Sequence, residues 1–305
     1  LLRMFADVEV PNKKADGHIQ TMAEAVSAEY DNTEKASRGE IAEIETGFPD
    51  LDHILDGICA PDLLILAARP GQGKSALITN IAHNVASPKK KAGKITKGRN
   101  VAMFILEMSN SQIVRRLIQT QTGISYSKQR KGKMTDGEWP VYTNAIAELE
   151  HLPIHLIDLP AIKPRDIRRI LRQLEAKHGK MDLVIVDYLQ LQEPDAPGQN
   201  RAQDVGSVAK ALKNICKEFD VPIIAAAQLS RAMEARQNKR PILPDLKESG
   251  GIEENADTVM FIYRPDQYEE NSSSKNKAEI IIAKHRNGPV GEVALLYLPE
   301  LTKFE

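Results

Sequence analysis

The stretch that decides the fold is LLILA at residues 63–67 followed by ARPGQGKS at residues 68–75. A short apolar run, typical of a buried strand, leads into a glycine-rich loop, and the loop leads into a helical stretch. Gly71 and Gly73 allow the backbone to curl so that its N–H groups point at phosphates. Lys74 can then reach the β and γ phosphate oxygens, and the Ser75 hydroxyl can bind Mg²⁺. The stretch therefore predicts a P-loop that binds ATP and Mg²⁺.

One position of this loop departs from the usual pattern. Ala68 stands where the common motif has its first glycine, so the prediction depends on the order of strand, loop and helix. An ordinary glycine-rich turn is the alternative, and the spacing of Gly71, Gly73 and Lys74 disfavours it. The positive N-terminal end of the helix that follows also favours a bound phosphate.

Length and composition indicate one large domain with an extra segment. The chain has 305 residues, whereas one hydrophobic core usually stops growing at about 250–300 residues. With a net charge of −1 the chain has no overall basic field, so a nucleic acid would have to bind local basic patches. Cys59 and Cys216 are the only two cysteines and lie far apart in the sequence. This points to a reducing compartment, and it argues against a metal site made of thiolates.

Targeting signals are absent from the sequence as given. It contains no apolar run of about 18 residues and no basic-then-apolar start, so we expect a cytoplasmic protein with no membrane partner. The first residue is Leu1 rather than Met, which is compatible with a fragment of a longer protein.

Residues 1–40 are expected to form a linker segment, because they are polar and contain few large apolar residues. Within them a helix is predicted at about residues 19–31. Its apolar residues recur at helical spacing and form one narrow stripe: Ile19, Met22, Ala23, Val26 and Tyr30. Two partners for this stripe remain open, namely the helix's own domain and another subunit.

Residues 41–305 are expected to form an α/β domain, because short β-rich runs alternate with helical stretches. The expected parallel strands are residues 63–67, 101–106, 154–157, 183–186 and 222–226. Three further runs, at residues 259–263, 278–283 and 293–298, leave little room for crossover helices and suggest an antiparallel extension at one edge. Ligands of such sheets bind at the carboxyl ends of the strands.

Three polar residues follow these apolar strands. Asp187 ends the run at residues 183–186, as in a Walker B motif whose carboxylate holds Mg²⁺ through water. Glu107 ends the run at residues 101–106 and can orient and deprotonate the attacking water, although it could instead be an N-terminal helix charge. Gln228 can hydrogen-bond a γ-phosphate and release it after hydrolysis.

Several short motifs occur in order from about residue 44 to the end of the chain. They are TGF at 46–48 with LD at 51–52, AARP at 67–70, LEMS at 106–109, VDYLQ at 186–190, QLSR at 228–231, DLKESG at 245–250 and KHRNG at 284–288. Together they resemble the C-terminal motor domain of DnaB-type replicative helicases. The resemblance implies a RecA-like P-loop NTPase core, with a mostly parallel twisted sheet, helices on both faces and an antiparallel edge extension. It also implies a homo-hexamer around single-stranded DNA.

The resemblance assigns roles to individual residues. Glu107 would be the catalytic base, Gln228 would link the γ-phosphate to the DNA loops, and Lys284 and Arg286 would reach the neighbouring subunit's nucleotide. Mg²⁺ would be held by Ser75 and Asp187. The residues expected around the nucleotide are Arg69, Pro70, Gly71, Gln72, Gly73, Lys74, Ser75, Ala76 and Arg116.

The expected DNA contacts also follow from the resemblance. They are Lys247, Glu248, Ser249 and Gly250 in one loop, Arg201 in a second loop at residues 193–204, and Lys210 on the helix after that loop. A lysine, glycines and no aromatic residue fit contact with the DNA backbone without base readout. Lys247 and Lys210 stand where the family usually has arginine. Lys210 and Lys213, on the helix after the second loop, could instead be solvated surface charges.

Two features do not follow the family pattern. Residues 88–99 form a basic insertion, expected to be a disordered outer loop, with DNA or partner contact as the alternative. His151 and His155 have zinc-like spacing, but Pro153 between them argues against one helix, so they are interpreted as loop and strand residues.

The predicted function is that of an ATP-driven 5′ to 3′ DNA helicase motor that assembles as a ring. The family's N-terminal domain, which contacts primase, is not in this sequence, and residues 19–31 resemble the linker helix that docks on an adjacent subunit. Primase and a helicase loader are therefore possible partners. A RecA-like recombinase and a nucleotide-switched assembly module are the alternatives.

Overall fold

The computed structural model describes residues 21–38, 44–91, 94–159, 161–196, 198–246, 250–268 and 275–305. The chain divides into two compact units, Leu1–Glu43 and Ile44–Glu305.

The described part of the first unit is a single helix, α1 (Met22–Ser37). Thr21 caps it, because its hydroxyl accepts the Glu24 N–H while the Glu24 carboxylate accepts the Thr21 N–H at 2.7 Å. The helix was expected at about residues 19–31, so it continues further toward the C-terminus than predicted, and Ile19 lies outside the described residues. Met22, Val26 and Tyr30 of the predicted stripe are exposed.

The second unit is built on a nine-stranded sheet with the order β11-β10-β9-β8-β1-β7-β6-β4-β5. The strands are β1 (Leu63–Ala68), β4 (Val101–Ile105), β5 (Ile154–Asp158), β6 (Leu183–Asp187), β7 (Ile223–Gln228), β8 (Thr258–Tyr263), β9 (Lys277–His285), β10 (Gly291–Leu298) and β11 (Lys303–Phe304). The strands from β8 to β5 are parallel, and β9, β10 and β11 extend the sheet antiparallel. The predicted fold class is confirmed.

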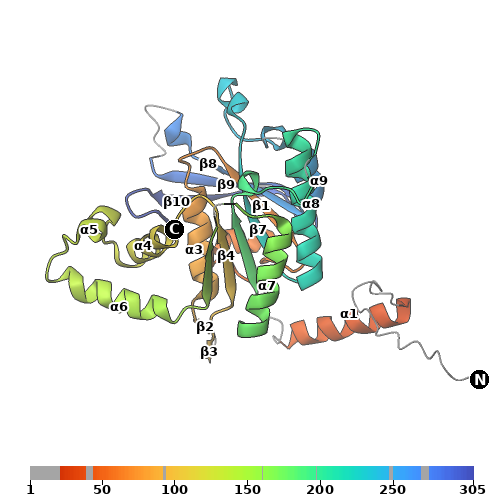
Figure 1. Ribbon diagram of the computed structural model, residues 1–305, viewed down its shortest axis with the longest axis horizontal. Coiled ribbons are helices and arrows are strands. Elements are labelled where there is room, and N and C mark those ends of the chain that lie inside the picture. The colour runs from red at the N-terminus through yellow and green to blue at the C-terminus, as the bar shows by residue number, and fades with distance from the viewer. Residues whose placement is uncertain are drawn as a thin grey trace, which may run out of the picture. The chain divides into compact units, whose positions relative to one another are not determined.

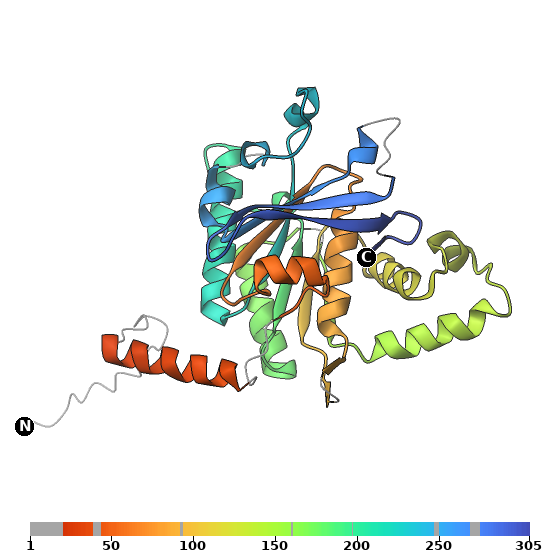
Figure 2. The same cartoon turned by 180° about the vertical axis from the view of Figure 1, so that it is seen from behind.

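Helices cover both faces of the sheet (Figures 1 and 2). One face packs against α2 (Pro49–Leu55), α3 (Lys74–Ala86) and α4 (Asn110–Thr122), and the other packs against α7 (Pro164–His178), α8 (Arg201–Phe219) and α9 (Gly250–Asn255). Alternate residues of β1 enter the two cores, with Leu64 and Leu66 in one and Leu63 and Ile65 in the other. Burial on both faces explains why the central strands are continuous apolar runs in the sequence.

Shorter elements connect these layers. They are α5 (Tyr126–Lys131), α6 (Glu138–Glu150), η1 (Leu189–Leu191), η2 (Arg231–Ala235), η3 (Leu243–Asp245) and η4 (Pro265–Gln267). Figure 1 shows α5 and α6 extending away from the sheet beyond α4. Of the helices that the structure describes, none combines the length and apolar character needed to cross a membrane.

One expectation about the sheet was wrong in part. The run at residues 259–263 was grouped with the antiparallel extension, but β8 pairs in parallel with β1, with Leu64 opposite Thr258, and only its other edge is antiparallel, against β9. The reason is that the chain between β7 and β8 forms a crossover through η2, η3 and α9 rather than a tight turn.

The basic insertion also differs from its prediction. Its described residues form an antiparallel hairpin of β2 (Lys89–Lys91) and β3 (Lys94–Thr96) instead of a disordered loop. Lys89 Nζ lies 2.8 Å from the Glu45 carboxylate, which ties the start of the hairpin to the domain.

The two cysteines lie in contrasting environments, and neither forms a disulfide. Cys59 is exposed, whereas burial raises the pKa of the Cys216 thiol to about 12. Because only the thiolate reacts quickly, we expect a maleimide at about pH 8 to label Cys59 of the folded chain and to leave Cys216 unmodified until denaturant is added. Mass spectrometry before and after denaturation measures this, with Cys59→Ser as the control. Fast double labelling of the folded chain would contradict the burial of Cys216.

Candidate nucleotide-binding site

The P-loop joins β1 to α3 with two glycines in the left-handed region. Gly71 has φ 80° and Gly73, the N-cap of α3, has φ 98°. The helix begins at Lys74, so its first N–H groups face the space above the carboxyl end of β1. The predicted order of strand, loop and helix is therefore present, with Ala68 as the last residue of the strand.

There is little room for a side chain at Gly73. A Cβ atom at this position would lie 2.9 Å from the Phe304 ring and 3.2 Å from the Tyr297 ring. We therefore expect Gly73→Ala to lose about 1–3 kcal/mol of unfolding free energy through backbone strain and this clash, and to bind ATP at least about tenfold more weakly because the loop moves. Urea unfolding and nucleotide titration measure the two effects.

Gly123→Ala is the matched control for this prediction. Gly123 also has a positive φ, 72°, but its added Cβ would meet no atom within 4 Å. It should therefore lose less stability, because it suffers backbone strain alone, and it should keep its ATP affinity. Equal losses of stability in the two variants would show that the aromatic contact does not restrict Gly73.

A cavity of about 330 Å³ lies at the carboxyl edge of the sheet, where the parallel strands end. Parallel pairing places Ala68 beside Gln228 and Ile105 beside Asp187, so the ends of four strands meet at this edge. The cavity is lined by Ala68, Arg69, Pro70, Gly71, Gly73, Lys74, Ser75, Ala76, Glu107, Met108, Arg116, Tyr188, Gln228, Tyr297 and Thr302. The structure thus brings together most of the residues that the sequence predicts around a nucleotide.

Gln72 is the exception within the loop. Its side chain is buried and its amide donates to the Tyr268 hydroxyl at 3.2 Å, and it does not line the cavity. In this conformation only its backbone remains suited to a phosphate contact.

Asp187 lies directly beside the P-loop. The Ser75 hydroxyl donates to Asp187 Oδ2 at 2.6 Å, and Lys74 Nζ lies 3.4 Å from Oδ1. Oδ1 is buried and accepts no hydrogen bond from any residue that the structure describes. Carboxylate and hydroxyl oxygens are hard ligands of the kind that Mg²⁺ prefers, so Ser75 and Asp187 fit a magnesium ion bound with phosphates.

Tyr188 is a site residue that the sequence analysis did not single out. Its ring lies under the P-loop lysine, with Lys74 Nζ 4.3 Å from the ring centroid. Burial raises the pKa of its hydroxyl, and the nearby Glu107 and Asp187 carboxylates raise it further. The available signal was its place directly after Asp187, at the end of a buried strand.

Glu107 follows β4 and is exposed at the cavity. Helix α4 is capped without it, because Ser109 and Gln112 form the capping box. This arrangement favours the interpretation of Glu107 as a group that faces a nucleotide over its interpretation as a helix charge.

Gln228 is tied to the start of α8 through Gln190. The Gln228 N–H donates to Gln190 Oε1 at 3.2 Å, and the Gln190 amide donates back to the Gln228 carbonyl at 3.3 Å. The Arg201 guanidinium, in the first turn of α8, donates to the Gln190 carbonyl. The end of β7 is thus linked to α8, which begins at Arg201, so the predicted loop at residues 193–204 ends four residues earlier than expected.

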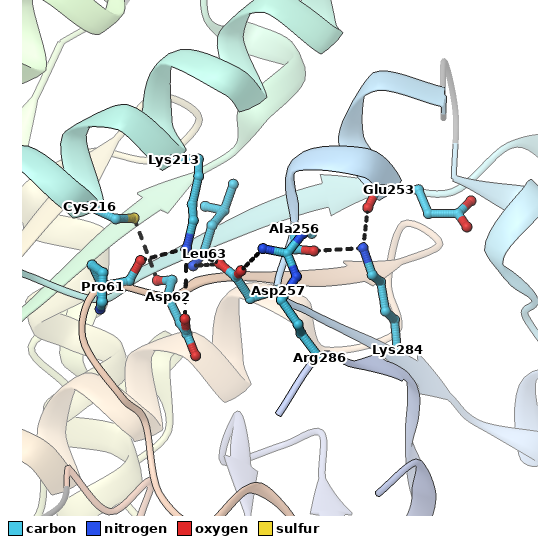
Figure 3. A network of polar contacts seen from close by, with 10 residues as sticks. All are labelled: Pro61, Asp62, Leu63, Lys213, Cys216, Glu253, Ala256, Asp257, Lys284 and Arg286. Atoms are coloured by element: carbon cyan, nitrogen blue, oxygen red, sulfur yellow. Dashed lines mark hydrogen bonds and ion pairs between the residues drawn. The ribbon is translucent and has the colours of Figure 1, made fainter. Parts of the chain in front are cut away.

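Lys284 and Arg286 lie at the amino edge of the sheet, where the parallel strands begin. The end of β9 pairs with the start of β8, with His285 opposite Thr258, and β8 runs parallel to β1. Lys284 Nζ donates to the Glu253 and Ala256 carbonyls, and Arg286 Nη1 donates to Asp257 Oδ1 at 2.8 Å (Figure 3). Burial, and then the Arg286 charge, lower the pKa of Lys284. The structure therefore does not bring this pair to the cavity of its own chain.

The predicted DNA contacts are only partly described. Lys247, Glu248 and Ser249 lie outside the described residues, whereas Gly250 is exposed at the start of α9. Arg201 and Lys210 are exposed on α8. Lys213 is not a solvated surface charge, because its ammonium group is largely buried and forms an ion pair with Asp257.

The histidine pair with zinc-like spacing lies where the sequence suggested. His151 ends α6 and His155 is on β5, with its ring 4.4 Å from the His178 ring. Burial and the charge of His178 lower the pKa of His155. Across the described ranges, no group of three or more His, Cys, Asp or Glu side chains is arranged to hold a metal ion.

Comparison with known proteins decides the family. The family model described as the DnaB-like helicase C-terminal domain matches residues 43–305. The chain belongs to this family. The resemblance inferred from the motifs is thereby confirmed.

Curated relatives agree with this assignment. The chain is 42% identical over 300 residues to the replicative DNA helicase DnaB of Geobacillus stearothermophilus and 40% identical over 300 residues to the replicative DNA helicase DnaC of Bacillus subtilis strain 168. Each alignment covers 97% of this chain and 64% of the relative. The chain thus spans less than two thirds of the length of these relatives.

Solved structures share the fold. One of them, an isolated ATPase domain, matches with a TM-score of 0.86 and 35% identity, over 94% of this chain and 98% of that one. A DnaB-like replicative helicase, solved in a study of its interactions with primase, matches with a TM-score of 0.82 and 34% identity, over 93% of this chain and 68% of that one. The RecA-like core expected for the family is therefore present.

Proposed function

We propose that this chain is the motor of an ATP-driven DNA helicase that works as a homo-hexameric ring on single-stranded DNA. The observation that carries the proposal is the separation of the site into two halves. The P-loop, Asp187 and Glu107 lie at the carboxyl edge of the sheet, and Lys284 and Arg286 lie at the amino edge. Two copies placed edge to edge would complete one site, and repetition of that contact closes a ring.

The chemistry follows from what each residue can do. The P-loop N–H groups and Lys74 would bind the phosphates of ATP, and Ser75 and Asp187 would hold Mg²⁺, which neutralises phosphate charge. The Glu107 carboxylate would orient the attacking water and accept its proton. Arg286 of the neighbouring copy would donate to the γ-phosphate oxygens, where negative charge develops during transfer.

DNA contact would come from the loops beside the nucleotide site. Gln228 is linked through Gln190 to the first turn of α8, and α8 packs against α9, which begins at Gly250, directly after the predicted DNA contacts Lys247, Glu248 and Ser249. A change at the γ-phosphate could therefore move these loops and the DNA backbone bound to them. Movement in the 5′ to 3′ direction and a cytoplasmic location are parts of the proposal taken from the family resemblance.

Further partners belong to the same proposal. The structural relative that was studied with primase supports a primase as a partner of the complete protein. A helicase loader is proposed on the resemblance alone. Docking of α1 on an adjacent copy is proposed on the resemblance to the family's linker helix.

Steady-state ATP turnover tests the proposal, measured against protein concentration with and without single-stranded DNA. We expect turnover per chain to rise steeply with concentration as rings form, and to be stimulated by DNA. A forked DNA duplex reports strand separation under the same conditions. Turnover that does not depend on concentration or DNA would instead favour a nucleotide-switched module, and strand pairing in open filaments would favour a recombinase.

A further inference from the structure

Asp257 lies at the centre of a polar network at the amino edge of the sheet (Figure 3). It directly precedes β8, and its side chain is only 3% exposed. Its carboxylate accepts from the Leu63 N–H at 2.8 Å, from Lys213 Nζ, and from Arg286 Nη1 at 2.8 Å. The Arg286 N–H also donates to the Asp257 carbonyl at 2.9 Å.

Contacts other than that with Arg286 hold the Asp257 carboxylate in place. Leu63 is the first residue of β1, and Lys213 is on α8, where its ammonium group also donates to the Pro61 carbonyl at 2.8 Å. Both contacts are made to Asp257 Oδ2, which leaves Oδ1 for Arg286. The carboxylate is therefore held by the central strand and by a core helix, and one of its oxygens faces the arginine.

Charge balance supports the same arrangement. Asp62 also lies 3.7 Å from Lys213, and burial and the Asp257 charge raise the pKa of its carboxyl group. A buried carboxylate persists only when it is paired and hydrogen-bonded, and Lys213 with the Leu63 N–H supplies these contacts. Each oxygen of the Asp257 carboxylate thus faces a basic group, Oδ2 the Lys213 ammonium and Oδ1 the Arg286 guanidinium.

The Arg286 side chain is anchored at one nitrogen and is otherwise largely exposed to solvent. The Arg286 side chain is 52% exposed, although one of its nitrogens is bound to a carboxylate that is almost fully buried. A long exposed side chain otherwise samples many rotamers. A guanidinium group carries several N–H donors, so one can stay on Asp257 while others donate to phosphate oxygens.

We propose that Asp257 is a positioning residue, which holds Arg286 in the orientation in which it is offered to the nucleotide of a neighbouring copy. The inference rests on the proposed function, because it assumes that Arg286 acts across a subunit contact. Asp257 itself touches no nucleotide. It acts through Arg286 and through its fixed place on β1 and α8.

A double-mutant cycle tests this role in the full chain. Asp257→Asn, Arg286→Ala and the double variant are compared by kcat and KM for ATP with single-stranded DNA present. We expect Asp257→Asn to lower kcat roughly 10- to 100-fold, because a misplaced arginine loses transition-state contacts, and to change KM by less than about twofold. In the Arg286→Ala background, Asp257→Asn should lower kcat no further.

Asp182→Asn is the matched control. Asp182 also lies at the amino edge, accepts the Asn100 N–H at 2.8 Å and lies 3.7 Å from Arg99, but it makes no contact with Arg286. It should lose some thermal stability and keep its kcat. If Asp257→Asn does not fold, Asp257→Glu takes its place, because it retains the charge opposite Lys213 while moving the carboxylate by one methylene group.

The outcomes separate this inference from the proposed function. A normal kcat for the folded Asp257 variant, beside a large loss in Arg286→Ala, would overturn the positioning role alone. A further loss in the double variant would do the same, since Asp257 would then act elsewhere. Full turnover by Arg286→Ala would instead contradict the action of Arg286 on the nucleotide of a neighbouring copy, and with it both proposals.

Discussion

Arg286→Ala should lower ATP turnover about 10³-fold or more while leaving ATP binding almost unchanged. The physical reason is that an arginine supplied by a neighbour stabilises charge only in the transition state, an effect of roughly 10³–10⁵ in rate. Arg286 lies at the edge of the sheet opposite its own P-loop, so its loss should leave the binding half of each site intact. Steady-state kinetics give kcat, and equilibrium titration with a fluorescent ATP analogue gives the affinity.

Two controls sharpen this result. Arg172→Ala removes an arginine of similar exposure, 49%, that also pairs with a carboxylate, Glu218, but on α7 outside the site. It should keep full turnover. In addition, Arg286→Ala chains mixed with Lys74→Ala chains should regain activity, because one variant contributes the P-loop and the other contributes the arginine. Absence of activity in mixed rings would contradict a shared site.

The strands beside the P-loop could be predicted closely because their residues are apolar on both faces. The runs at residues 63–67, 101–106 and 183–186 are observed as β1, β4 and β6 with their ends shifted by one residue at most. The carboxyl ends of parallel strands meet at one edge, so Asp187, Glu107 and Gln228 could be placed together from the sequence alone.

The amino edge could not be predicted in the same way. Asp257 contacts Leu63, which is 194 positions away in the sequence, and Lys213, which is 44 positions away. No local pattern links an aspartate before a strand with a lysine in the middle of a helix. Lys213 consequently resembled a surface charge, although the fold buries it.

The direction of β8 was misjudged for a related reason. The gaps that follow this run, before residues 278–283 and 293–298, are short and suggest hairpins. The crossover that precedes it, from β7 to β8, has only 3₁₀ turns and the short helix α9 among its described residues. A crossover without a long amphipathic helix gives almost no periodic signal in the sequence. The roles proposed for Lys284 and Arg286 rest on the family resemblance, because hydrophobic periodicity gives no signal for them.

Glu107→Gln should lower kcat for ATP by about 10²–10⁴-fold, because the amide cannot accept the proton of the attacking water. ATP affinity should be unchanged or higher, since the substitution removes a negative charge from the cavity that we propose binds the phosphates. Glu107 is exposed and does not cap α4, so the fold should be unaffected. Single-turnover hydrolysis isolates the chemical step, and equilibrium titration reports binding.

Glu150→Gln is the matched control, since Glu150 is an exposed glutamate at the end of α6, away from the cavity. It should hydrolyse ATP at the rate of the unchanged chain. The proposed function has Glu107 act on the copy's own nucleotide and Arg286 on the neighbour's, so chains with Glu107→Gln should not be rescued by Lys74→Ala chains. Both substitutions disable the same half of the site. Rescue in that mixture would show that Glu107 contributes to a neighbouring nucleotide and not to its own.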